Sequence, residues 1–368
     1  MYSDNQGLSL IQKLDFSLFN IYKHAETKLH ELRYLFWEAT LKCNLSCLHC
    51  GSDCHSSKKE IDMPAADFLK TTAEIANRYD SSKIMIIITG GEPLLRQDLE
   101  FIGRQLTLQG YRWGMVSNGM ALTQNRLASL VAAGLASITI SLDGLQKQHN
   151  WLRNNPKSYE KVIKAIQQLV NYPEVVFDVA SCVNAQNLPI LSTLRNELIY
   201  LGVKKWRLFS ITPIGRAAQI PELQLKPEEF TQLLDFIASC RQSADIEVSY
   251  GCEGFLGSYE KKVRNQNFFC RAGIHIGGIM SNGDILACPN IDRRYKQGNI
   301  YDDDFASVWE HKFDVMRNRQ WMKKGKCKEC KHFRNCKGNG MHLHSPDQDD
   351  VFYCHVENLK DKTSHIIN

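Results

Sequence analysis

Short apolar runs alternate with amphipathic stretches between residue 34 and about residue 211, which is the pattern of successive βα units. Six of these runs are rich in β-branched or aromatic residues and are predicted to be strands, at 34–39, 84–89, 112–117, 137–141, 175–183 and 206–211. Strands that alternate with helices in this way form a parallel sheet. We therefore predict an α/β protein whose main domain is a partial (β/α)6 barrel similar to a TIM barrel.

Prolines and glycines mark the ends of the intervening helices, and Pro64, for example, opens a helix that runs to residue 79. A further helix from Pro227 to about residue 243 is expected to leave the barrel. From residue 250 onward, glycines and cysteines replace regular periodicity. We expect three parts: an N-terminal helical extension at 1–30, the barrel at 31–245, and a small cysteine-rich domain at 246–368.

Composition and charge are those of an ordinary globular protein. Of 368 residues, 43% are hydrophobic and 23% are charged, and the net charge of +5 is too small to indicate nucleic acid. No apolar run approaches 18 residues and no leader is apparent, so we expect a cytoplasmic protein that binds no membrane. A basic run at 323–337 is expected to be a solvated face, with an anionic leader peptide or prosthetic group as the alternative.

Thirteen cysteines favour metal ligation over disulfides, because an odd number cannot pair completely and reducing compartments do not keep disulfides. Four lie within residues 43–54 and seven within residues 252–354. Cys182 and Cys240 stand apart in apolar segments, where a cysteine is typical of the core. This distribution predicts a core followed by a second, metal-rich region.

The first cluster places three thiols, Cys43, Cys47 and Cys50, within eight residues directly after the first predicted strand. A four-iron cluster normally takes four cysteines, so three of them leave one iron open to an exogenous ligand. The spacing alone also fits a zinc knuckle completed by Cys54 or His55.

The C-x3-C-x2-C motif at the end of a first barrel strand resembles that of the radical S-adenosylmethionine (SAM) superfamily, over residues 34–214. Further motifs of that family follow in order after the next strands. They are Gly90-Gly91-Glu92-Pro93, Ser117-Asn118-Gly119, Ser141 with Asp143, and Arg153 ten residues beyond Asp143.

The resemblance implies a [4Fe-4S] cluster on the three cysteines, with SAM on the open iron and a flavodoxin- or ferredoxin-type electron donor. The catalytic residues would be Cys43, Cys47 and Cys50. Arg153 would hold the methionine carboxylate of SAM, and His49 would lie against the adenine. The remaining implied contacts to SAM are Gly90, Gly91, Glu92, Pro93, Ser117, Asn118, Ser141 and Asp143, with softer matches at Asn184, Asn187 and Arg216.

The second cysteine region resembles the SPASM extension, which carries auxiliary iron–sulfur clusters. The resemblance implies a distal cluster on Cys327, Cys330, Cys336 and Cys354, although the spacing alone also fits a zinc ribbon.

At the implied proximal cluster, Gly340 stands where the SPASM pattern has a cysteine. Cys252 is predicted to join Cys270 and Cys288 there, which leaves an iron for substrate, water or a side chain such as His342. A smaller cluster, or none, is the alternative. Cys252 could instead remain a free thiol that returns a hydrogen atom to a substrate radical.

The leading functional hypothesis is therefore a radical SAM/SPASM enzyme that modifies a peptide or small protein by crosslinking, thioether formation, oxidation or epimerisation. One alternative is formylglycine formation of the sulfatase-maturase type, against which Gly340 counts. The hypothesis from another class is a non-catalytic metal or redox scaffold. No residue is assigned as a catalytic base.

Overall fold

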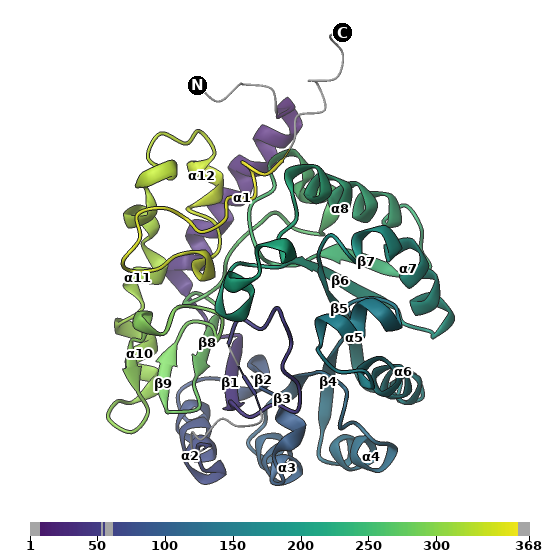
Figure 1. The fold of residues 1–368 in the computed structure, drawn as a ribbon. Coiled ribbons are helices and arrows are strands. Elements are labelled where there is room, and N and C mark those ends of the chain that lie inside the picture. Colours follow the sequence, from purple (N-terminus) through teal and green to yellow (C-terminus); the bar gives the residue numbers. More distant parts are fainter. Residues whose placement is uncertain (1–7, 53, 56–61, 360–368) are drawn as a thin grey trace.

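The computed structural model describes residues 8–52, 54–55 and 62–359. Its strands form one curved sheet with helices along the outer face (Figure 1), in the order β10-β9-β8-β1-β2-β3-β4-β5-β6-β7. Six of these strands confirm the predicted βα pattern and run parallel in sequence order: β1 Tyr34–Thr40, β2 Met85–Gly90, β3 Arg112–Ser117, β4 Leu135–Ser141, β5 Val176–Val183 and β6 Lys205–Ser210.

The sheet extends beyond the six predicted strands at both edges. β7 (Glu247–Tyr250) pairs in parallel with β6, and β8 (Ile276–Ile279) pairs in parallel with β1. Two short antiparallel strands, β9 (Asp284–Leu286) and β10 (Gly298–Asn299), continue the sheet from β8. The cysteine-rich part of the chain is therefore hydrogen-bonded to the first barrel strand, and the limits of the three predicted domains remain a prediction.

The outer helices bury their apolar faces against the sheet. In chain order they are α2 Ala65–Ala76, α3 Leu99–Leu108, α4 Gln124–Ala132, α5 Gln146–Leu152, α6 Ser158–Leu169, α7 Leu191–Tyr200 and α8 Pro227–Cys240. The expectation that the helix after Pro227 leaves the barrel is wrong. Four of its apolar side chains are fully buried, and Phe236 packs edge-on against Trp206 of β6, so α8 is the crossover from β6 to β7.

Helix α1 (Leu10–Leu29) begins at a capping box formed by Ser9 and Gln12. It packs on the cysteine-rich region (Figure 1), where the rings of Phe16 and Phe255 lie 5.4 Å apart. The other helices of that region are α9 Glu260–Val263, α10 Phe305–His311, α11 Asp314–Arg317 and α12 Phe333–Cys336. Within the described part of the chain, no helix has the length and apolar character needed to span a bilayer.

Packing between β1 and α2 centres on two aromatic rings. Trp37 and Phe68 are fully buried and stacked, with ring centroids 4.0 Å apart and an interplanar angle of 5°. We predict that Trp37→Ala lowers the free energy of unfolding by about 3–5 kcal/mol, because the lost ring leaves a cavity against Phe68. Denaturant unfolding measures this change, and Tyr200→Ala, at a ring that is 89% exposed, should leave stability almost unaltered. Equal losses in the two variants would contradict the packing described.

Candidate active site and cluster sites

The three thiols of the first cysteine cluster line one cavity of about 230 Å³ at the carboxyl ends of the strands. Cys43 and Cys47 are buried and Cys50 is half-buried. Several of the predicted SAM contacts line the same cavity. Its walls also include His49, Gly51, Cys54, Thr89, Gly90, Gly91, Ser117, Asn118, Ser141, Arg153 and Arg216.

Two glycines after β2 bring this strand end against the cysteine loop. The Gly91 N–H donates to the Thr40 carbonyl at 2.7 Å. A Cβ atom on Gly90, whose φ is +133°, would lie 2.2 Å from that oxygen, and one on Gly91 would lie 2.2 Å from the Lys42 carbonyl. No side chain fits at either position. The glycines therefore hold the cysteine loop in place, in addition to lining the cavity.

Arg216 ties the cysteine loop to the end of β6. Its Nε donates to the Cys47 carbonyl at 2.7 Å and its guanidinium reaches the Cys54 carbonyl at 3.2 Å. Its backbone N–H donates to the Cys50 carbonyl at 3.0 Å. Arg216 is only a softer match to the family motifs in the sequence. The signal that could have indicated its role is the Gly215-Arg216 pair after the sixth strand.

Glu92 joins the ends of β2 and β3 through the hydrogen bonds that its carboxylate accepts. It accepts hydrogen bonds from the N–H groups of Leu94 at 3.0 Å and Asn118 at 2.7 Å, and from the Ser117 hydroxyl at 2.9 Å. Burial raises the pKa of Glu92 despite these donors. The Asn118 side chain in turn donates to the Cys43 sulfur at 3.7 Å. Glu92 therefore positions residues beside the cluster cysteines.

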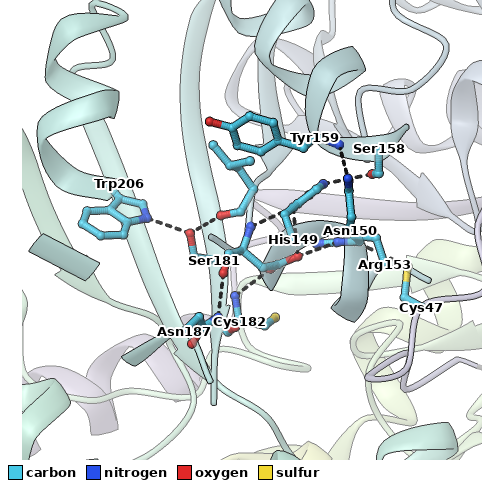
Figure 2. Close-up of polar contacts among 12 residues, drawn as sticks. Cys47, His149, Asn150, Arg153, Ser158, Tyr159, Ser181, Cys182, Asn187 and Trp206 are labelled. Carbon is cyan, nitrogen blue, oxygen red and sulfur yellow. Dashed lines mark hydrogen bonds and ion pairs between the residues drawn. The ribbon is translucent and has the colours of Figure 1, made fainter. Parts of the chain in front are cut away.

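A buried ion pair connects the fourth strand end to the cysteine loop (Figure 2). Arg153, at the C-terminal end of α5, donates through Nε to Asp143 Oδ2 at 2.5 Å and through its guanidinium to the Cys47 sulfur at 3.8 Å. The other Asp143 oxygen accepts from the Cys182 N–H at 2.9 Å. Burial alone would raise the pKa of Asp143, but the Arg153 guanidinium holds it at about 2.

His149 lies behind this pair with both ring nitrogens engaged. Its Nδ1 accepts from the Asp143 N–H at 3.1 Å, so its Nε2–H donates to the Ser158 hydroxyl at 2.9 Å (Figure 2). Burial lowers the pKa of His149 to about 3. The imidazole is therefore neutral, and its tautomer is set by the two partners.

Cys182, which its apolar surroundings predict to be a core residue, is half-buried and packs against a small apolar cluster that includes Leu152 and Ile211. Its sulfur, a nitrogen of His49 and a carboxylate oxygen of Asp143 all lie within 4.8 Å of one another. Burial raises the pKa of the Cys182 thiol, so it is protonated near neutral pH. Alternation along β5 buries Val179 and Val183 on one face and places Cys182 on the other face. Cys240, by contrast, is buried in α8.

The C-terminal cysteines form two groups. Burial, together with the nearby thiols of Cys354 and Cys330, raises the pKa of Cys327 to about 11. The Cys336 thiol interacts electrostatically with these three thiols. Burial, with Cys252 and Cys270 close by, raises the pKa of Cys288 to about 12. These electrostatic interactions place the thiols of each predicted ligand set near one another, and their binding of a cluster remains a prediction.

One cavity of about 520 Å³ lies between α1 and the cysteine-rich region, and a cysteine of each group lines it. Burial lowers the pKa of Lys23 on its wall to about 8. Only part of the basic run at 323–337 faces this cavity. The cysteines and cations that line it are Cys270, Cys336, Lys23, Lys28, Arg317, Arg319, Arg334 and Lys337.

Comparison with known families identifies two domains in the chain. The radical SAM superfamily profile matches residues 37–185, and the profile of the SPASM iron–sulfur cluster-binding domain matches residues 270–337. The chain belongs to the radical SAM superfamily. A radical SAM domain binds a [4Fe-4S] cluster together with SAM, and a SPASM domain binds auxiliary iron–sulfur clusters. This radical SAM enzyme presents thiols in the groups that such clusters need.

Its relatives have several activities. The AdoMet-dependent heme synthase of Oleidesulfovibrio alaskensis is 26% identical over 327 residues, which cover 83% of this chain and 82% of that protein. The mycofactocin maturase MftC of Mycolicibacterium smegmatis is 27% identical over 86% of this chain and 82% of its own length. The crystal structure of Streptococcus suis SuiB bound to its precursor peptide SuiA shares the fold, with a TM-score of 0.66, 19% identity and coverage of 92% and 79% of the two chains.

The neutral state of His149 makes stability depend on pH. Below pH 6.5, the ordinary pKa of histidine, His149 of the unfolded chain binds a proton. His149 of the folded chain, with a pKa of about 3, does not bind it. We predict that this residue lowers the free energy of unfolding by up to about 1.4 kcal/mol per pH unit as the pH falls from 6.5 toward 3. Unfolding of the cluster-free protein across this range measures the effect. His149→Gln should flatten the dependence and the exposed His311→Gln should not; an unchanged slope in His149→Gln would be the contrary result.

Proposed function

We propose that this enzyme cleaves SAM reductively and uses the resulting radical to modify a peptide or small protein. The observation that carries the proposal is that the Cys43, Cys47 and Cys50 thiols share one cavity with a guanidinium that is held by a buried carboxylate. Three thiols supply three cluster ligands and leave one iron for SAM.

Cys43, Cys47 and Cys50 would hold the [4Fe-4S] cluster, which with bound SAM would supply the electron that breaks a carbon–sulfur bond of the sulfonium and yields the 5′-deoxyadenosyl radical. The chain's own residues orient SAM for this step. Arg153 is fixed by Asp143, so its remaining N–H groups are available to bind the SAM carboxylate at low cost in conformational entropy. His49 lies on the cavity wall as the proposed neighbour of the adenine. The proposed electron donor is a flavodoxin or ferredoxin.

The sheet's inner face supports a polar substrate such as a peptide. Asp178 accepts from the Thr139 hydroxyl at 2.7 Å and pairs with Arg207, whose side chain is 42% exposed. Alternation along β6 places Arg207 on the face opposite the buried Trp206, which packs under α8. The maturase name of MftC and the peptide complex of SuiB favour the same substrate class.

Modification of an iron porphyrin is a second candidate, favoured by the heme synthase relatives at 26% identity over 83% of the chain. The exposed guanidinium of Arg207 suits the carboxylate side chains of such a ring as well as those of a peptide. Incubation of the reduced enzyme and SAM with short peptides encoded beside its gene, and separately with a porphyrin carrying propionates, distinguishes the two. A mass change or deuterium exchange confined to the porphyrin would overturn the peptide proposal.

SAM cleavage is predicted to depend on the cysteine triplet. Anaerobically reconstituted and reduced wild-type protein should form 5′-deoxyadenosine, and Cys43→Ala/Cys47→Ala/Cys50→Ala should form none, because it lacks the ligands of the open-iron cluster. Chromatography of the nucleoside products measures this. Cys240→Ala, at a buried cysteine on α8, is the control and should retain cleavage. Cleavage by the triple variant would contradict the site assignment.

The Asp143–Arg153 pair is predicted to set SAM affinity. Asp143→Asn should weaken SAM binding at least about tenfold, because the guanidinium loses the charge that fixes it and one charged hydrogen bond is worth about 1.5–3 kcal/mol. Anaerobic equilibrium dialysis with labelled SAM measures the affinity, and unchanged iron content shows that the cluster has assembled. Asp178→Asn removes an ion-paired aspartate that does not line the SAM cavity and should leave SAM affinity intact. Equal affinities in both variants would refute the role of the pair.

A further inference from the structure

The proximal cysteine group lacks one ligand, yet the backbone that would deliver it is intact. Three consecutive residues, Lys337, Gly338 and Asn339, have left-handed φ values of 54°, 79° and 72° and turn the chain sharply after Cys336. The Asn339 N–H donates to the Cys336 sulfur at 3.1 Å. This turn joins the distal cysteine group to Gly340, the position where the SPASM pattern has its cysteine.

Contacts from two other segments fix the turn. The Arg319 guanidinium donates to the Asn339 carbonyl at 3.3 Å and to the Cys270 carbonyl at 2.9 Å. The Asn339 side chain accepts from the Phe255 N–H at 2.8 Å. A Cβ atom on Gly340 would lie 2.9 Å from the carbonyl oxygen of Glu253, the residue that follows Cys252. Residue 340 is therefore held beside the proximal cysteines.

The imidazole of His342 occupies the space of the missing side chain. A Cβ atom built on Gly340 would lie 2.6 Å from Cε1 and 2.7 Å from Nδ1 of His342. The N–H of Met341, the intervening residue, hydrogen-bonds the Cys270 sulfur. No hydrogen bond to either ring nitrogen of His342 is found among the described residues, and the side chain is half-buried. An available nitrogen donor thus lies where the pattern expects a sulfur donor.

We propose that His342 is the fourth protein ligand of the proximal auxiliary cluster, together with Cys252, Cys270 and Cys288. Imidazole nitrogen is an established ligand of iron in iron–sulfur centres, where it raises the reduction potential relative to thiolate. Because four protein ligands leave no iron open, the proximal cluster transfers electrons and does not bind substrate. This inference rests on the auxiliary clusters of the proposed enzyme.

A nearby histidine, which is fully buried, provides a control. Among the residues that the structure describes, His355 has no hydrogen-bond partner at either ring nitrogen, and its ring is packed among Tyr250, Tyr353 and Phe230. A Cβ atom on Gly254 would lie 2.2 Å from its Nδ1. His355 thus matches His342 in residue type and location near the cysteine groups, while its ring lies against Gly254 instead of Gly340.

The test uses the full chain with Cys43→Ala/Cys47→Ala/Cys50→Ala, which removes the signal of the SAM-binding cluster. After reconstitution this protein should hold about eight iron atoms per chain, as two four-iron clusters require. Pulsed electron paramagnetic resonance of the reduced protein should show the ¹⁴N coupling of a directly bound imidazole. His342→Ala should abolish this coupling and His355→Ala should retain it.

A rescue variant keeps the test decisive if His342→Ala loses its cluster. Gly340→Cys/His342→Ala places a thiol at the pattern position after the clashing ring is removed, and the Glu253 carbonyl oxygen, 2.9 Å from the new Cβ, needs only a small shift. This variant should recover about eight iron atoms without ¹⁴N coupling and at a lower reduction potential. Iron for only one auxiliary cluster in the parent protein would overturn the proposal together with the auxiliary cluster on which it rests. Full iron without strong ¹⁴N coupling, or coupling that persists in His342→Ala, would overturn the ligand assignment alone.

Discussion

The buried ion pair of Asp143 and Arg153 is the interaction on which the site depends. Two charges removed from water are costly unless every hydrogen-bonding group around them is satisfied. Here the Asp143 carboxylate accepts from Arg153 and from the Cys182 backbone, while its own N–H is taken by His149. These contacts hold the end of β4, strand β5 and helix α5 around one guanidinium. The same guanidinium also contacts Cys47. These hydrogen bonds offset the free-energy cost of burying the two charges. They also fix a cationic group beside Cys47.

The main sheet and helix α1 also fix the position of the cysteine-rich region. Strand β8 pairs with β1, whose end leads into the cysteine loop, so both metal regions are built on one continuous sheet. Helix α1 packs across the cysteine-rich segment and donates from Lys23 to the Asn335 carbonyl at 2.6 Å, next to Cys336. Distances between the cysteine groups are therefore set by sheet register and helix packing, which are rigid compared with a flexible linker. Such rigidity suits electron transfer between fixed centres.

Sequence periodicity was sufficient for the barrel strands because each is a compact run of β-branched or aromatic residues. It missed β8, in which two of four residues are glycines and pairing with β1 supplies the stability instead of propensity. Cysteine spacing likewise indicated the ligand groups. The hydrogen bonds by which Glu92 and Arg216 join the strand ends could not be predicted from the sequence, since their partners are brought together only by the fold. The proximity of Cys182 to His49 and Asp143 could not be predicted from its apolar sequence neighbours, because adjacent residues of a strand face opposite ways.

Binding of SAM to an iron left open by Cys43, Cys47 and Cys50 is the central claim, and the most direct test is the electron paramagnetic resonance spectrum of the reduced protein before and after SAM is added. SAM should alter the signal of one cluster in the wild type and should alter nothing in Cys43→Ala/Cys47→Ala/Cys50→Ala, whose auxiliary signals should remain. A fully iron-loaded wild-type protein whose spectrum does not respond to SAM would contradict the claim.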